Sequence, residues 1–105
     1  MDTQDAVTAL SALAHGSRLD IFRLLVRAGP AGLTVSHIAA RLELPWATLS
    51  HHLAQLRRAG LVRVTRLGRQ AIQAADYGVM TDLLAYLTAN CCQGADTNLE
   101  LETTP

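Results

Sequence analysis

The chain has 105 residues, and 9 basic and 9 acidic side chains give it a formal net charge of zero. Half of the residues are hydrophobic and 17% are charged, which excludes a disordered or collagen-like chain. The length accommodates one domain with its own core. Leucine and alanine fill 18 and 17 positions, which favours helices. Because the chain is neutral, any attraction to nucleic acid or membrane has to be local.

The sequence predicts a cytoplasmic protein with no membrane contact. It has no apolar run long enough to span a bilayer, and its first residues, MDTQDAV, lack the basic and apolar parts of a signal peptide. The two cysteines, Cys91 and Cys92, are neighbours, so they cannot cross-link the fold. We therefore expect reduced thiols in a reducing compartment.

Apolar spacing predicts helices over 3–14 and 17–28, and Gly29 and Pro30 end the second of them. Thr34 is the expected N-cap of a short helix over 35–42. A tight turn then leads to a helix over 45–59, with proline at its first position.

The helix predicted over 45–59 has two faces. Leu49, Leu53 and Leu56 form its buried stripe. A polar stripe lies on another side and consists of Thr48, His51, Gln55 and Arg58. A short helix, a tight turn and a second helix with a polar outer stripe is the plan of a helix-turn-helix.

After this helix, the helical spacing of apolar residues gives way to an alternating pattern. Residues 61–66 and 70–75 predict two strands joined by a turn at 67–69, and 77–91 predict a last helix. Met80, Leu84, Leu87 and Cys91 are expected on one line of this helix, with Val79, Leu83 and Tyr86 beside it. The fold class is therefore mainly α with a small β-hairpin, as one domain over 1–92 followed by an acidic tail over 93–105 that we expect to be mobile.

Basic charge is concentrated in the middle of the chain. Residues 44–75 contain five arginines and no acid, which supplies the local field that DNA binding requires. Guanidinium groups suit phosphate oxygens and base edges. The alternative is a solvated basic face without a partner. The candidate contacts with double-stranded DNA are Trp46, Thr48, Ser50, His51, Gln55, Arg57, Arg58, Arg63, Arg66 and Arg69.

Trp46 and the four histidines need separate interpretations. Trp46 either contacts DNA or packs against the preceding helix. His51 is the better base contact of the two neighbouring histidines, whereas His52 is expected to be a hydrogen-bonded core residue. We interpret His15 as a helix-start residue and His37 as partly exposed.

The cysteine pair is the candidate ligand site. One thiol could be core filler and the other incidental, but two adjacent thiols at a helix end can converge on one soft ion once the last turn unwinds. Zinc usually takes four ligands and a C-x2-C spacing, so this pair is a poor zinc site. Trivalent arsenic or antimony, which needs three thiolates or fewer, fits better.

Three stretches resemble the winged helix-turn-helix of the ArsR (ArsR/SmtB) family of metalloregulatory repressors: LSALAHGSRLDIFRLL (10–25), LTVSHIAARLELPWATLSHHLAQLRRAGLV (33–62) and RVTRLGRQAIQAAD (63–76). The segment SHHLAQLRRAGLV (50–62) is especially specific. The resemblance implies a homodimer joined through the first and last helices, with the 45–59 helix in the major groove and the hairpin as a wing. It also implies release from operator DNA when an inducer binds.

The chain departs from two branches of this family. It has Thr-Val-Ser-His at 34–37, where the best-known arsenic members have Cys-Val-Cys, and Asp-Tyr-Gly at 76–78, where zinc sensors have Asp-x-His. It resembles instead a branch with Asn-Cys-Cys at the end of the last helix, matching 90–92. That branch generally recruits a third cysteine, which 93–105 lack. The third ligand is then a small thiol, water or a cysteine of the other subunit, or the inducer is methylarsenite, which needs two thiolates.

The resulting hypothesis is a dimeric repressor of an arsenic-resistance operon, released from DNA when As(III), Sb(III) or methylarsenite binds Cys91 and Cys92. A thiol redox or persulfide sensor of the same fold is the nearest alternative. A domain that dimerises without reading DNA is another. The sequence has no catalytic constellation that predicts an enzyme and requires no cofactor.

Overall fold

The structure, a computed structural model, describes residues 1–94, so the acidic tail expected over 93–105 lies outside the described residues from position 95 onward. The order of elements is α1 (Thr3–Leu13), α2 (Gly16–Ala28), β1 (Leu33–Thr34), α3 (Val35–Leu42), α4 (Trp46–Arg58), β2 (Val62–Leu67), β3 (Gln70–Ala75) and α5 (Tyr77–Thr88). The expected mainly α fold with a β-hairpin is confirmed. Within 1–94, no helix combines the length and the apolarity needed to cross a bilayer.

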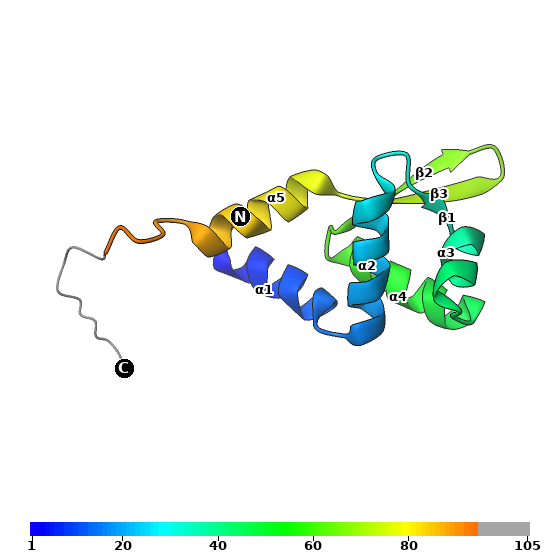
Figure 1. The fold of residues 1–105 in the computed structure, drawn as a ribbon, viewed down its shortest axis with the longest axis horizontal. Coiled ribbons are helices and arrows are strands. Elements are labelled where there is room, and N and C mark those ends of the chain that lie inside the picture. Colours follow the sequence, from blue (N-terminus) through cyan, green and yellow to red (C-terminus); the bar gives the residue numbers. More distant parts are fainter. Residues whose placement is uncertain (95–105) are drawn as a thin grey trace.

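α2 occupies the centre of the molecule (Figure 1). α1 and α5 lie together on one side of it, α3 and the β2–β3 hairpin extend on the other, and α4 crosses behind it. The hydroxyl groups of Thr3 and Tyr86 hydrogen-bond and join α1 to α5. Tyr77 donates a hydrogen bond of 2.9 Å to the carbonyl of Val26, which joins the start of α5 to the end of α2.

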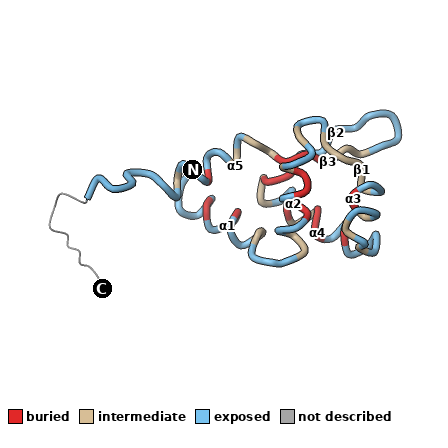
Figure 2. Tube along the Cα trace, in the orientation of Figure 1, coloured by how far each residue is buried: buried red, intermediate tan, exposed pale blue. Residues whose placement is uncertain are grey.

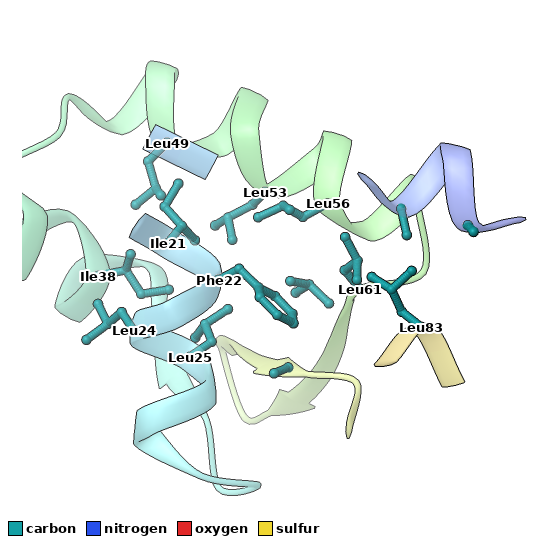
Figure 3. Close-up of a cluster of buried hydrophobic side chains, with 14 residues drawn as sticks. Ile21, Phe22, Leu24, Leu25, Ile38, Leu49, Leu53, Leu56, Leu61 and Leu83 are labelled. Atoms are coloured by element: carbon teal, nitrogen blue, oxygen red, sulfur yellow. The ribbon is translucent and has the colours of Figure 1, made fainter. Parts of the chain in front are cut away.

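The core forms where α2 meets α3 and α4 (Figures 2 and 3). Ile21 and Leu25 of α2, Ile38 of α3 and Leu49 of α4 are fully buried there, as is Leu61 just after α4. Burying one such side chain contributes about 1.5–3 kcal/mol to folding. The predicted buried stripe of the 45–59 helix is confirmed, and this burial fixes which side of α4 faces outward.

Local caps set the helix starts. Asp2 caps α1 in a reciprocal capping box, and the Nδ1 atom of His15 accepts a 3.2 Å hydrogen bond from the Ser17 amide at the start of α2. The Thr34 hydroxyl accepts a bond of 3.1 Å from the His37 amide, as expected of an N-cap. Pro45 is the N-cap of α4, so the helix begins one residue later than predicted.

The sheet has a third strand that the sequence did not indicate. β3 lies between β1 and β2 and pairs antiparallel with both, so that Leu33 faces Gln73 across the ladder. Gly32 makes this approach feasible, because its φ is +72° and a Cβ there would lie 2.4 Å from the Gln73 carbonyl oxygen. The link holds the start of α3 against the middle of β3.

The last helix is shorter than predicted. α5 ends at Thr88, and a turn with left-handed backbone at Asn90 (φ 59°) and Cys92 (φ 66°) follows. Cys91 is therefore exposed in a turn and does not continue the helical line of Met80, Leu84 and Leu87. Leu84 and Leu87, on the apolar line of this helix, are 56% and 55% exposed. No described element of this chain covers that face of α5.

Candidate nucleic-acid interface and dithiol site

α3 and α4 form the predicted helix-turn-helix. The turn depends on Glu43, whose left-handed backbone ends α3, and the amide of Leu44 donates a 3.1 Å bond back to the Ala39 carbonyl. Packing of α4 on the core leaves the remaining sides of that helix outward. Gln55 is half-buried, and the other candidate DNA contacts of α4 are exposed: Trp46, Thr48, Ser50, His51, Arg57 and Arg58.

One side of α4 faces the hairpin across two neighbouring hollows. Ser50 and Arg57 line the larger, of about 460 Å³, together with Arg66 of β2. Trp46 lines the other, of about 300 Å³, with Arg66 and with Arg69 from the hairpin turn. The structure thus brings these five residues together, and we call them the α4–wing surface. The 56% exposure of Trp46 favours an outward position over packing in the core.

The other candidates lie elsewhere. Gln55 and Arg58 line a separate hollow against α1. His51 lies on the same side of α4 as Gln55 and Arg58, which follow it by four and seven residues. Arg63 is at the base of the hairpin, where its Nε atom is 3.8 Å from the Asp76 carboxylate. The predicted contacts are therefore spread over about half of the α4 surface.

The structure adds residues that the sequence analysis missed. Ser36 in the first turn of α3 and Gln70 at the start of β3 line the same hollow as Trp46. The position of Ser36 was a usable signal, because the free amides of a helix start attract phosphate. The neighbouring hollow also reaches Gln73, which is 2% exposed and whose Oε1 atom lacks a partner in the described part of the chain. An amide buried in this way is normally satisfied by an ordered water.

The three histidines near the start of α2 meet. The ring of His52 lies 4.7 Å from that of His15 and 5.9 Å from that of His51. His52 is buried as predicted, but its Nδ1 atom has no hydrogen-bond partner among residues 1–94. Burial, and then the positive charges of His15, Arg18 and His51, lower the pKa of His52. His37 is exposed.

Cys91 and Cys92 form an accessible dithiol. Both are free and exposed, and their Sγ atoms are 3.3 Å apart. Two thiolates that each lie about 2.3 Å from one shared ion are roughly 3–4 Å apart, so little rearrangement is needed to chelate. Among residues 1–94 there is no group of three histidine, cysteine or acidic side chains arranged to hold a metal ion. Within this part of the chain the site offers two ligands.

Known proteins match both the sequence and the fold. A family model described as a helix-turn-helix domain matches residues 13–65. Transcriptional activator HlyU of Vibrio cholerae is 43% identical over 61 residues, which are 58% of this chain and 54% of that protein. The aligned segment thus spans about half the length of that relative. The solved structure of HlyU is 35% identical, with a TM-score of 0.65 over 83% of this chain and 97% of HlyU.

Two further structures share the fold. An ArsR-like transcriptional regulator from Rhodococcus sp. RHA1 has a TM-score of 0.75 at 24% identity, covering 91% of this chain and 87% of that one. The homodimeric winged helix-turn-helix DNA-binding domain of Mb0332 from Mycobacterium bovis has a TM-score of 0.67 at 25% identity, covering 90% and 86%. From the family match, the similarity to HlyU and the shared fold, we conclude that this chain belongs to the ArsR family of winged helix-turn-helix transcription regulators.

Proposed function

We propose that this chain is a dimeric transcriptional repressor that binds operator DNA and releases it when a trivalent arsenical binds Cys91 and Cys92. The observation that carries the DNA-binding part is the α4–wing surface, where three arginines from α4 and the hairpin line two hollows beside an exposed tryptophan. α4 enters the major groove in this proposal, and Arg66 and Arg69 bind the flanking phosphates.

Exposed apolar side chains support a homodimer. Val7 and Leu10 of α1 are 48% and 41% exposed, and Leu84 and Leu87 of α5 are more than half exposed. Large apolar side chains exposed on two neighbouring helices are typical of an interaction site. A second copy that packs α1 and α5 against the same elements removes these side chains from water and spaces two α4 helices for a two-fold symmetric operator. The homodimeric state of the Mycobacterium bovis relative supports a dimer.

The dithiol supports an inducer that takes two thiolates. When methylarsenite binds, both thiol protons are lost, two sulfur–arsenic bonds form, and the two hydroxyl groups of the arsenical leave as water. The methyl group keeps the third position of arsenic, so no further ligand is required. Inorganic As(III) and Sb(III) need a third donor from outside the described residues. We therefore rank methylarsenite first among the three inducers.

The thiols lie where they can affect the dimer. Cys91 is three residues beyond the end of α5, and Leu87 is one helical turn before it. Ring closure through arsenic constrains the backbone between Cys91 and Cys92, where Cys92 is left-handed and follows the left-handed Asn90 by two residues. A change there alters how α5 packs on its partner and hence how far apart the two α4 helices are held. A coupling of about 1–3 kcal/mol corresponds to about a 5- to 150-fold loss of DNA affinity.

The test begins with a DNA probe, selected from a pool of random 30-base-pair duplexes with the full chain. Fluorescence anisotropy of this probe is then titrated with methylarsenite, arsenite and antimonite under a constant excess of reductant. The wild type should release DNA, and Cys91→Ser and Cys92→Ser should each retain it. Equal release from all three proteins would remove the thiols from the mechanism. In a separate titration without reductant, release by an oxidant that reductant alone reverses, together with no effect of the arsenicals, would favour the redox sensor.

Whether the protein represses or activates transcription needs a separate experiment, because HlyU is named an activator. A bound regulator represses when its site overlaps the promoter. In vitro transcription from a promoter that contains the selected site should fall when the protein is added and recover with methylarsenite. A rise in transcript on adding the protein would make this chain an activator.

A further inference from the structure

An apolar hollow of about 340 Å³ lies between α2 and α5, on a different side of the molecule from the α4–wing surface. Phe22 and Val26 of α2 line it together with Met80 and Leu83 of α5. Apart from two arginines, every lining side chain is apolar. The volume and the lining are typical of sites for small organic ligands, which combine a hydrophobic wall with a few polar groups that set orientation.

The two arginines give the hollow a charged rim. Arg23 and Arg27 are one helical turn apart on α2, and both are exposed. Neither has a carboxylate within ion-pair distance among residues 1–94, where the one salt bridge joins Arg63 to Asp76. Long arginine side chains lay their methylene groups along apolar surface and keep their guanidinium groups in water. The rim therefore presents two unneutralised positive charges at the mouth of an apolar hollow.

We propose that this hollow binds an amphiphilic monocarboxylate, with its apolar body between α2 and α5 and its carboxylate on Arg23 and Arg27. A guanidinium pair selects against cations and adds little for neutral molecules, whereas a planar carboxylate matches the fork of donors. The apolar lining selects against nucleotides and sugars, which need many more polar partners than two. A medium-chain fatty acid has the required combination.

The position of the hollow would give such a ligand an effect on α5. Met80 and Leu83 lie in the middle of that helix, and Leu84 at the edge of the hollow also belongs to the apolar face proposed for the dimer. An occupant contacts α5 two turns before the thiols, from the side of α2. The site uses neither cysteine, so it adds a second, thiol-independent input to the regulator.

Isothermal titration calorimetry of the full chain with decanoate, below micelle formation, tests the proposal. Decanoate should bind saturably, and hexanoate should bind more weakly by about fourfold for each methylene removed that was buried. The double variant Arg23→Gln/Arg27→Gln should weaken decanoate by about fivefold and leave decanol unchanged, because only the charged contact is lost. Arg41→Gln on α3 is the matched control and should bind as the wild type does.

A second variant addresses the hollow itself. Val26→Phe places a larger apolar side chain at a half-buried position of the wall and should weaken decanoate and decanol alike. Absence of saturable binding would overturn the proposal, as would equal decanoate affinity in the double arginine variant. Light scattering during the titration gives a third outcome. If decanoate converts dimers to monomers, the hollow is a subunit contact and the ligand site is rejected.

Discussion

His52 is the buried side chain whose protonation the fold opposes most directly. It lies on the inner side of α4 with its Nδ1 atom unpartnered in the described chain, and a second imidazole, that of His15, is 4.7 Å away between ring centroids. Desolvation is the largest cause of its lowered pKa, followed by the charges of His15, Arg18 and His51. The folded state therefore favours the neutral imidazole over the charged one.

This shift predicts a loss of stability in mild acid. Because the folded pKa lies below the unfolded value of about 6.5, the unfolded chain binds more protons between the two values. Stability is complete above pH 6.5 and falls as the pH drops through that value towards the folded pKa. Urea unfolding at pH 7.5 and 5.5 should show this decrease. His52→Gln should reduce the difference between the two pH values, whereas His37→Gln, at an exposed position, should preserve it. If His52→Gln loses as much stability between pH 7.5 and pH 5.5 as the wild type does, other groups cause the effect.

The sequence predicted the burial of His52 but not its missing partner. Burial follows from helical spacing, since His52 lies between Leu49 and Leu56. The position of His15 beside His52 depends on how α2 crosses α4. A local sequence pattern does not predict that crossing. His15 was predicted as a helix-start residue, and this is confirmed because its Nδ1 atom caps α2.

Among the elements, α5 depends on a single capping residue. The Oδ1 atom of Asp76 accepts a 3.0 Å bond from the Val79 amide, and its Oδ2 atom is 3.8 Å from Arg63 of β2. The same residue thus begins α5 and faces the base of the hairpin. The cap contributes more than the ion pair, because the Arg63 side chain is 67% exposed and screened by solvent.

Replacement of this residue separates the two contacts. Asp76→Ala should lower the free energy of unfolding by about 1 kcal/mol, the usual cost of a lost N-cap. Asp76→Asn keeps an acceptor oxygen and should cost less than about 0.5 kcal/mol, as should Asp82→Ala at an exposed site on the same helix. Chemical denaturation at pH 7.5 gives all three values. An Asn variant as damaged as the Ala variant would mean that the ion pair dominates.

The elements with strong local signals were predicted well. Capping residues and the 3.6-residue period located α1 to α4 within one or two residues, and alternation located β2 and β3. β1 has two residues, too few for a periodic pattern, and exists because β3 pairs with it. The end of α5 was wrong because the apolar spacing continues through Leu87 to Cys91, while the backbone turns at Asn90.

At the scale of the whole molecule, charge is separated although the total is zero. The α4–wing surface carries three arginines without a paired acid in the described residues, whereas Arg63 on the same hairpin is beside Asp76. The sequence predicted the local excess of charge. It did not predict that Gln55 and Arg58 would lie towards α1, because that division depends on where the hairpin and α1 pack around α4.

The salt dependence of DNA binding measures this difference. Each phosphate contact contributes about 0.9 to the slope of log affinity against log salt, and a dimer has two copies of every contact. Arg66→Gln should therefore reduce the slope by about 1.8, and Arg63→Gln by clearly less. Arg23→Gln, far from the α4–wing surface, should leave the slope unchanged. Anisotropy titrations between 50 and 200 mM salt provide the comparison, and equal reductions for Arg63 and Arg66 would contradict the ranking.

The middle position of β3 has a mechanical consequence. β3 pairs with β2 along its whole length and with β1 at Ile72 and Gln73. Displacing β3 therefore breaks both ladders, and the hairpin and the start of α3 move together. β3 continues through Asp76 directly into α5. A tilt of α5 therefore moves the hairpin and the start of α3 together. The backbone change that accompanies this tilt is confined to the single-residue connection at Asp76. The sheet and the start of α3 keep their shape.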